Sequence, residues 1–544
     1  PVGSKATVYL PESSIKAVTV NGKLPEKQEG IISLEEENGR IKVVLGSGEY
    51  NFVCGTENSL PVNGEEVSKL ITSEGLVLLK NENNALPLKN GTKIALFGEG
   101  QADRFQQGSG IDSLTYQAGF VAFGAGSSRA LGKNGTVAPL DAFRQAQSAG
   151  EVSIYEPLSQ KYQTEELTVT KESSGRIARF DLDYTPDDEM IDSAAEFADT
   201  AIVFISRWGG ECRDFSKEQW YLSDDEKALL KSASAKFDKV IVVLNTSNAI
   251  DTSWAFENSD GIDVDAVLFA GYPGVHGGLA IADIILGKTN PSGKLTFTFA
   301  KDIDDYPTTE SFLKQPEQEY TEDIFLGYRY FETFNKEVNF PFGFGLSYTE
   351  FKTEKESFSV DGDTVTVKVK VTNIGNVTGK EVVQLYFSAP QGVLGKAAKE
   401  LCAFKKTRAL APGGSEVLTL SFNKNDMASF DDLGKTGNKS AYVLEAGDYK
   451  VFAGNSVKNV SEMGVVTVNE LTVVEQLSSQ CPSNLTKRLL ADGSFEETEQ
   501  TQNTYVLNNE VTVEAEDYTD KGYGSEGKKD LPKEEGIGNG YLYN

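Results

Sequence analysis

The sequence is poor in the residues that most often carry metal or nucleophilic chemistry. Its 544 residues include a single histidine, His276, and four cysteines. No two cysteines form a CxxC pair, and none has the spacing of metal ligands. With a single histidine and scattered cysteines, neither a zinc site nor a Ser-His-Asp triad is expected. We therefore expect no metal and no cofactor, and we expect any chemistry to rest on carboxylates.

Positive charge and long apolar runs are also scarce. Lys and Arg number 52 against 81 Asp and Glu, which gives a formal net charge of −29. Such a surface repels phosphate backbones and anionic lipid, so nucleic acid and membrane are not expected as partners, whereas neutral sugars stay open. No apolar stretch approaches the roughly 18 residues of a membrane span. The start, PVGSKATVYL, has no signal-peptide pattern and resembles the middle of a longer polypeptide.

The middle of the chain alternates apolar strands with helices. Strand-like apolar runs lie at 93–100, 200–206, 239–245 and 265–271. Between them a capping box, Ser223 to Glu226, begins a helix, and residues 68–81 show the amphipathic pattern of another helix. Apolar strands that alternate with helices are typical of a parallel sheet covered on both faces. The sequence therefore predicts an α/β sandwich domain over residues 56–345.

Segments rich in β-strand signals flank this α/β part. Residues 346–470 carry period-two apolar patterns, such as the alternate valines of DTVTVKVKVTN, and predict a β-sandwich. Residues 1–55 hold short strands amounting to about half of an antiparallel sandwich. Residues 471–510 are polar and predict a linker, after which residues 511–544 begin a further β-rich unit. The predicted fold class is thus α/β, followed by a β-sandwich, with partial β-sandwich flanks.

Three loops are candidates for a ligand site because they leave the carboxyl ends of predicted parallel strands, where open α/β sheets bind ligands. They are residues 206–214, 245–251 and 270–278. The first reads SRWGGECRD and contains Glu211, with glycines that allow close approach to a ligand and Trp208 as a stacking face for a sugar. From spacing alone, a solvated loop acid explains Glu211 better than a catalytic group does, because most loop glutamates have no chemical role.

Other residues in these regions are better explained by structure than by chemistry. GAGSSR (124–129) begins like a dinucleotide fingerprint, but Arg129 stands where the third glycine belongs, so nucleotide binding is not expected. His276 precedes a helix and suits a structural place or the edge of a ligand site. Cys212 has no histidine nearby in the sequence to act as its base, so a plain loop thiol is favoured.

Several motifs in order resemble glycoside hydrolase family 3 β-glycosidases over about residues 65–470. The segment AIVFISRWGGECRDFSKEQWYLSDDEKALL resembles the acid/base segment of that family. It is followed by AGYPGVHGGLAIADIILGKTNPSGKLTFTF, by YTEDIFLGYRYF and by FPFGFGLSYTEF. TGKEVVQLYFSAP through LEAGDYKVFAGNS then resembles the family's fibronectin-III-like sandwich, which implies that fold for residues 346–470.

The resemblance implies that Glu211 is the general acid/base. Asp214 also matches the family motif, whereas Cys212 replaces a glycine and Phe215 replaces an arginine, which leaves the loop geometry and the sugar contacts open. Four residues are candidates for substrate binding: Arg207, Trp208, Asp214 and Arg129.

The second carboxylate of a retaining enzyme is missing. In family 3 the nucleophile is an aspartate of a Ser-Asp-Trp type motif on a TIM-like barrel, and neither the motif nor a barrel pattern occurs here. Residues 471–500 resemble the connector of family 3 enzymes in which the barrel follows the sandwich. We therefore expect a barrel outside this chain, from the same parent polypeptide or from another chain.

The two flanks resemble carbohydrate-active modules. Residues 5–53 are similar to the closing sandwich of family 78 α-L-rhamnosidases, and residues 511–544 to the start of a family 6 carbohydrate-binding module, a jelly roll. The implied function is part of a retaining exo-β-glycosidase, with β-glucosidase favoured, acting on oligosaccharides or aryl β-glycosides. The alternative is a non-catalytic carbohydrate-binding or scaffold protein of the same fold. An extracellular or periplasmic location is favoured, and a cytoplasmic one stays open.

Overall fold

The structure is a computed structural model of the whole chain. It describes residues 5–10, 15, 18–20, 30–37, 40–48, 50–54, 64–107, 115–123, 136–165, 167–171, 177–182, 184–207, 209, 215–256, 261–312, 319–478 and 485–498. The statements below concern these residues.

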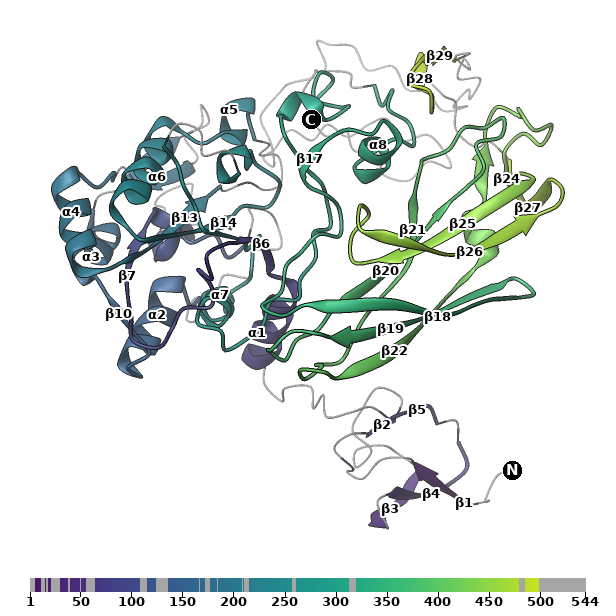
Figure 1. Cartoon of the computed structure of the whole chain (residues 1–544), viewed down its shortest axis with the longest axis horizontal. Helices are drawn as coiled ribbons and strands as arrows, with labels where there is room; N and C mark the ends of the chain where they lie inside the picture. Colours follow the sequence, from purple (N-terminus) through teal and green to yellow (C-terminus); the bar gives the residue numbers. More distant parts are fainter. Residues whose placement is uncertain are drawn as a thin grey trace, which may run out of the picture.

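A six-stranded sheet forms the centre of the α/β domain (Figure 1). Its strands, in spatial order, are β10 (Val152–Ile154), β7 (Thr92–Phe97), β13 (Thr200–Ser206), β14 (Lys239–Asn245), β15 (Ala266–Phe269) and β6 (Val77–Asn81). The first five strands are parallel, and β6 pairs antiparallel with β15 at the edge. The parallel sheet predicted from the sequence is therefore confirmed, with one antiparallel edge strand added.

Helices cover both faces of this sheet, and each strand sends alternate side chains into two separate cores. In β13, Val203 and Ile205 enter one core, which α3 (Glu156–Thr164), α4 (Asp188–Phe197) and α6 (Asp224–Lys236) complete. Ile202 and Phe204 enter the other core, with α2 (Pro139–Ser148) and α7 (Gly277–Ile285). Burial on both faces explains why β13 is apolar at every position from Ala201 to Ile205.

The prediction of one helix over residues 68–81 is wrong in its second half. Helix α1 (Gly64–Gly75) ends at the glycine, and the next residues form β6. Leu76 and Leu78 lie in one core, while Val77 and Leu79 lie in the other. A short apolar run buried on both sides has no period that separates a strand from a helix, which is why the pattern misled.

The second domain is a β-sandwich, as predicted. One sheet has the order β18 (Phe351–Asp361), β19 (Thr364–Asn373) and β22 (Ser415–Asn423). The facing sheet has the order β21 (Glu400–Lys406), β20 (Val382–Ser388), β25 (Gly447–Gly454) and β26 (Val460–Val468). Val365, Val367, Val369 and Val371 are all buried between the sheets, as their period of two predicts.

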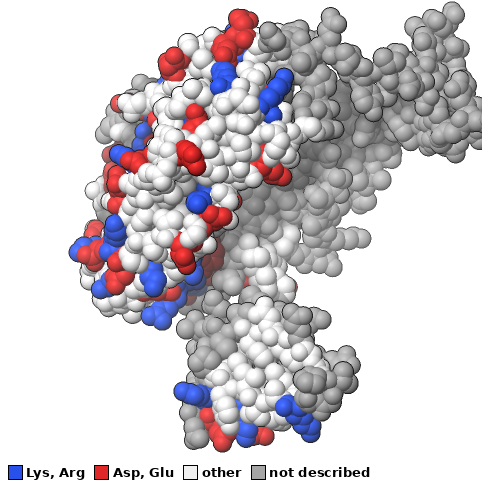
Figure 2. All heavy atoms as spheres, turned by 90° about the vertical axis from the view of Figure 1, so that its right-hand side faces the viewer, with Lys and Arg blue, Asp and Glu red and all other residues white. Residues whose placement is uncertain are grey.

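A third, smaller sheet and a hairpin extend the sandwich. β23 (Ser429–Asp431), β24 (Ala441–Leu444) and β27 (Thr472–Gln476) form the small sheet, so residues 472–476, which the sequence places in the linker, pair with the sandwich. β28 (Lys487–Leu489) and β29 (Phe495–Glu497) form the hairpin. Figure 2 shows acidic and basic side chains interspersed over the face of the molecule that is turned to the right in Figure 1.

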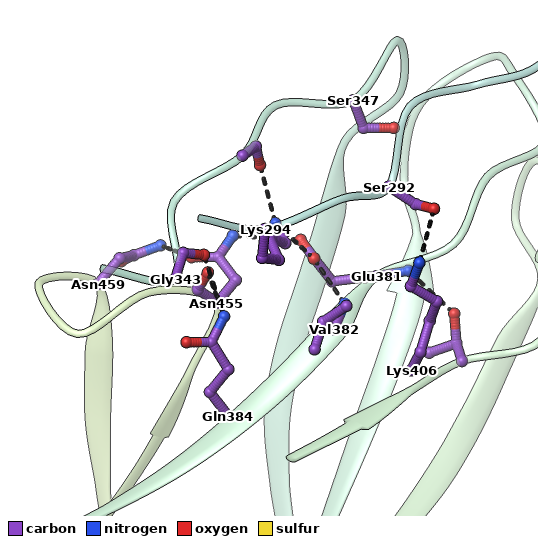
Figure 3. A network of polar contacts seen from close by, with 12 residues as sticks. Ser292, Lys294, Gly343, Ser347, Glu381, Val382, Gln384, Lys406, Asn455 and Asn459 are labelled. Atoms are coloured by element: carbon purple, nitrogen blue, oxygen red, sulfur yellow. Dashed lines mark hydrogen bonds and ion pairs between the residues drawn. The ribbon is translucent and has the colours of Figure 1, made fainter. Parts of the chain in front are cut away.

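The α/β domain and the sandwich meet through buried polar contacts (Figure 3). Lys294 pairs with Glu381 at 2.8 Å, and both side chains are nearly buried. Gln384 of the sandwich donates from Nε2 to the Gly343 oxygen of the α/β domain at 3.0 Å, and also to the Asn455 oxygen within the sandwich at 3.0 Å. These contacts join segments far apart in the sequence, so the two domains share one polar interface.

The N-terminal strands lie apart from these two domains. β4 (Arg40–Leu45) pairs antiparallel with β1 (Ala6–Leu10) and β3 (Ile31–Glu37), and β2 (Val18–Val20) pairs with β5 (Phe52–Cys54). Short antiparallel strands were predicted here. The predicted carbohydrate-binding module at 511–544 lies outside the described residues.

Candidate active site

The three predicted loops all leave the same edge of the central sheet, since they follow β13, β14 and β15. Within the first loop the structure describes Arg207, Gly209 and Phe215, whereas four of the candidate residues lie outside the described part of the chain. These four are Glu211, Trp208, Asp214 and Arg129. The described residues show how the segment that contains Glu211 is held.

Asn245, the last residue of β14, ties the neighbouring loops together. The side chain is fully buried. Its Nδ2 donates to the carbonyl oxygens of Val121 at 2.9 Å and Gly271 at 2.7 Å, and its Oδ1 accepts from Val121 N at 2.7 Å. Its backbone oxygen accepts from Arg207 N at 3.1 Å. The Asn245 side-chain amide therefore fixes the loop after β15 and the chain at residue 121, while the backbone oxygen of the same residue fixes the start of the loop after β13.

The Arg207 guanidinium uses all five of its N–H groups within the domain. Nε donates to the Gln219 carbonyl oxygen at 3.1 Å, Nη1 to the Ser206 oxygen at 2.9 Å and Nη2 to the Tyr221 oxygen at 3.2 Å. The remaining two N–H groups bind both carboxylate oxygens of Glu226, at 2.6 and 2.7 Å. These contacts hold the beginning of the loop against the chain that follows it. A direct contact of Arg207 with a sugar stays a prediction.

Glu226 also caps the N-terminus of α6. Its Oε2 accepts from Ser223 N at 2.8 Å, and the Ser223 hydroxyl accepts from Glu226 N at 3.1 Å. This is the capping box expected from the sequence, and it satisfies N–H groups that a helix start leaves free. The same carboxylate thus caps α6 and neutralises Arg207, which links the position of the loop to the position of the helix.

Tyr272, in the loop after β15, reaches across to the Glu211 segment. Its hydroxyl accepts from Gly209 N at 2.7 Å and donates to the Arg207 carbonyl oxygen at 2.9 Å. Burial raises the pKa of this phenol, and contacts with the Ser247 hydroxyl and the Gly209 amide oppose the rise. All three strand-end loops therefore meet at Tyr272.

Other titratable groups lie in or beside this edge of the sheet. Burial raises the pKa of Asp251, in the loop after β14, although hydrogen bonds from Ser253 oppose the shift. His276 stands at the N-cap of α7, and its Nδ1 is buried without a hydrogen-bond partner. The structural place predicted for His276 stays a prediction.

Further away, burial raises the pKa of the Cys402 thiol to about 12, so that it stays protonated at neutral pH. Among the described residues, no cluster of three or more His, Cys, Asp or Glu side chains has the arrangement of a metal site. None of the described helices has the length and apolar character needed to cross a membrane.

Sequence reasoning missed the supporting residues of this site. Asn245 and Tyr272 fall in loops that were predicted, but neither residue type nor spacing pointed to the backbone groups that they bind. Glu226 was predicted only as a helix cap. Their partners lie 19 to 124 residues away, so only the fold brings them together.

Domain comparisons match the two folds described above. Residues 76–348 match the glycosyl hydrolase family 3 C-terminal domain, and residues 381–457 match the fibronectin type III-like domain. The chain belongs to glycoside hydrolase family 3. The resemblance drawn from the sequence motifs is confirmed, as is the order of α/β domain and sandwich. The resemblances of the two flanks stay predictions.

Family 3 relatives extend over most of the chain. Beta-glucosidase A of Butyrivibrio fibrisolvens is 39% identical over 482 residues, which cover 80% of this chain and 55% of that protein. A beta-glucosidase of Ruminococcus albus is 38% identical over 79% of this chain and 44% of its own length.

Solved structures of beta-glucosidases superpose on most of this chain. The structure of a beta-glucosidase from Paenibacillus barengoltzii superposes with a TM-score of 0.69 at 37% identity, covering 81% of this chain and 49% of that one. Beta-glucosidase 3B from Thermotoga neapolitana, in complex with glucose, gives a TM-score of 0.64 at 33% identity, with 75% and 54% covered. The chain spans about half the length of the relatives that it matches.

Proposed function

We propose that this chain supplies the general acid/base of a retaining exo-β-glycosidase of the β-glucosidase type, and that Glu211 is that residue. The observation that carries the proposal is that the motif segment with Glu211 follows β13, a central strand, and that Arg207 and Asn245 hold its beginning. Ligands of open α/β sheets bind at this edge. The names of the family 3 relatives support a β-glucoside as substrate.

The proposed reaction needs two carboxyl groups about 5–5.5 Å apart on either side of the glycosidic bond. In the first step Glu211 protonates the leaving oxygen while an aspartate attacks the anomeric carbon. In the second step Glu211 removes a proton from the water that releases the sugar. The aspartate belongs to a barrel outside this chain. Trp208, Asp214, Arg129 and Arg207 are the proposed substrate contacts.

Replacing Glu211 by Gln in the complete polypeptide tests this proposal. General acid/base catalysis contributes about 10²–10⁴-fold in rate, so we expect a loss of that size in the turnover of an aryl β-glucoside with a poor leaving group. We also expect the basic limb of the pH profile to disappear, because the acid must be protonated to act. Azide should restore turnover of an activated substrate, because as an anion it attacks the glycosyl-enzyme without a general base.

Glu218→Gln is the matched control, since Glu218 lies on α5 (Lys217–Trp220), seven residues away, and is fully exposed. It should turn over substrate like the unchanged enzyme. Unchanged turnover in Glu211→Gln, or a loss without rescue by azide, would contradict the assignment of Glu211.

A further inference from the structure

The Tyr272 hydroxyl, in the loop after β15, contacts the backbone at the start of the loop after β13. It accepts from Gly209 N and donates to the Arg207 oxygen, and a contact with the Ser247 hydroxyl adds the loop after β14. Gly209 itself is buried. Its N–H therefore depends on the phenol, because a buried amide without an acceptor destabilises the fold.

Two further observations bear on this contact. A phenol of ordinary pKa near 10 is protonated at neutral pH, and burial raises the pKa of Tyr272 further, so the hydroxyl donates to the Arg207 oxygen at neutral pH. The residue before it, Gly271, is fixed in turn by the Asn245 side chain at 2.7 Å. The backbone next to Tyr272 is thus fixed by Asn245 of β14, while the Tyr272 hydroxyl fixes the start of the loop after β13.

We propose that Tyr272 is a positioning residue for the acid/base segment: its hydroxyl fixes the backbone at Arg207 and Gly209 and thereby sets where the Glu211 carboxyl meets the glycosidic oxygen. This inference rests on the proposed function of Glu211. A displacement of about 1 Å at a reacting group lowers a rate by up to about 10²-fold. A freed loop therefore weakens proton transfer while the sugar contacts made by the barrel stay in place.

Tyr272→Phe in the complete polypeptide tests the proposal, because it removes the hydroxyl and keeps the ring. For β-glucosides with poor, alkyl leaving groups, which need the acid, we expect kcat to fall about tenfold, part of the ~10²–10⁴ that such catalysis contributes. For a dinitrophenyl β-glucoside, which leaves without protonation, the loss should stay under about twofold. KM should change little for either substrate.

Tyr306→Phe is a control with the same hydrogen-bond pattern. The Tyr306 hydroxyl accepts from Ala300 N at 3.2 Å and donates to the Thr298 oxygen at 2.8 Å, away from the three loops. This variant should affect both classes of substrate equally. Hydrogen exchange of the peptide 207–215, measured on this chain, should become faster in Tyr272→Phe and stay unchanged in Tyr306→Phe.

Three outcomes would overturn the proposal: unchanged exchange of peptide 207–215, a rate loss independent of the leaving group, or kinetics equal to those of Tyr306→Phe. Failure of the proposed function is a different result, namely full activity in Glu211→Gln. If Glu211→Gln is impaired while Tyr272→Phe matches its control, Glu211 keeps its role and Tyr272 loses the positioning role.

Discussion

At the scale of single residues, the Asn245 side-chain amide connects β14 with the chain at Val121 and with the loop after β15. Its side chain is fully buried and binds the backbone of two other segments, at Val121 and at Gly271. A carboxamide suits this place because it donates and accepts at once. No aspartate or leucine of similar size would satisfy both the carbonyl oxygens and the amide.

We expect Asn245→Ala to destabilise the α/β domain by about 3 kcal/mol or more. Truncation leaves three backbone groups unpaired, and each buried group without a partner costs about 1–3 kcal/mol. Urea unfolding measures the loss, and Asn248→Ala, in the exposed part of the same loop, should cost under about 0.5 kcal/mol. A loss below about 1 kcal/mol in Asn245→Ala would mean that the freed groups find other partners.

The sequence offered a candidate acid for this site but none of its supports. Glu211 could be proposed because the segment around it resembles a family motif, and its role stays a prediction. Tyr272 lies in a loop that was predicted, but its structural role comes from the hydrogen bond that its hydroxyl accepts from Gly209 N, 63 residues earlier. Contacts of this kind depend on the register of β13 against β14 and β15, which no local pattern encodes.

At the scale of elements, the first turn of α6 and the loop after β13 depend on one carboxylate. Glu226 binds Arg207 with both oxygens and accepts from Ser223 N. The Arg207 side chain is only 12% exposed and the Glu226 side chain 23%, so solvent screens their attraction less than it screens a surface pair.

We expect Ser223→Ala and Glu226→Ala to differ, although both remove part of the cap. Ser223→Ala removes one acceptor and should cost about 1 kcal/mol without changing kcat. Glu226→Ala also leaves the Arg207 charge unpaired in a half-buried place, so its cost should exceed that of Ser223→Ala by about 1–2 kcal/mol, and kcat should fall as well. Urea unfolding and steady-state kinetics check both. Equal losses would show that Arg207 does not depend on Glu226.

The elements themselves were predicted unevenly, for physical reasons. β13 and β14 were located at 200–206 and 239–245 as the structure has them, because strands buried on both faces are continuous apolar runs. The run at 76–79 has the same character, but it directly follows an amphipathic helix, and only Gly75 marks the boundary. Edge strand β6 was missed for that reason.

At the scale of the whole molecule, charges from the two domains meet at one carboxylate. Glu74, in α1, pairs with Lys380 at 2.5 Å and with Lys406 at 2.6 Å, both from the sandwich. Burial raises the pKa of Glu74, but the two lysines outweigh it and the pKa lies below its ordinary value. The pKa of Lys406 is lowered mainly by burial, and Glu74 opposes that shift.

We expect the stabilisation from Glu74 to depend on pH in the acid range. Because its pKa is lower in the folded protein, the contribution is complete above the ordinary pKa of about 4.5. It should be lost as the pH falls through the lower, folded value. Thermal unfolding at pH 7, 5 and 3.5 should show that Glu74→Gln destabilises the chain at the first two values and by a smaller amount at the third, because pH 3.5 lies below the ordinary pKa.

Glu337→Gln is the control for that experiment, since Glu337 pairs with Lys301 within the α/β domain and its side chain is 82% exposed. An exposed pair contributes about 0–1 kcal/mol, so this change should be small at every pH. A Glu74→Gln variant that behaves like Glu337→Gln would show that the stability of the chain does not depend on the half-buried contacts of Glu74 with Lys380 and Lys406.

The order of the domains followed from the sequence, whereas their interface did not. Glu74 and Lys406 are 332 residues apart and look like ordinary surface charges in their own elements. Lys294 and Glu381 likewise form an ion pair only because the folded sandwich packs against the α/β domain. Motif order locates domains, but it carries no information on which of their charges become buried together.

The contacts of Asn245 and Tyr272 also affect whether single loops of this domain can be exchanged with those of a relative. Each loop at the carboxyl edge supplies backbone groups that another loop satisfies, as at Gly271, Arg207 and Gly209. In a chimera that takes one loop from a relative, polar backbone atoms of the neighbouring loops therefore lose their hydrogen-bond partners. Recombination at this edge should succeed when all three loops are inherited as one block, and crossover points between β13 and β15 should be selected against.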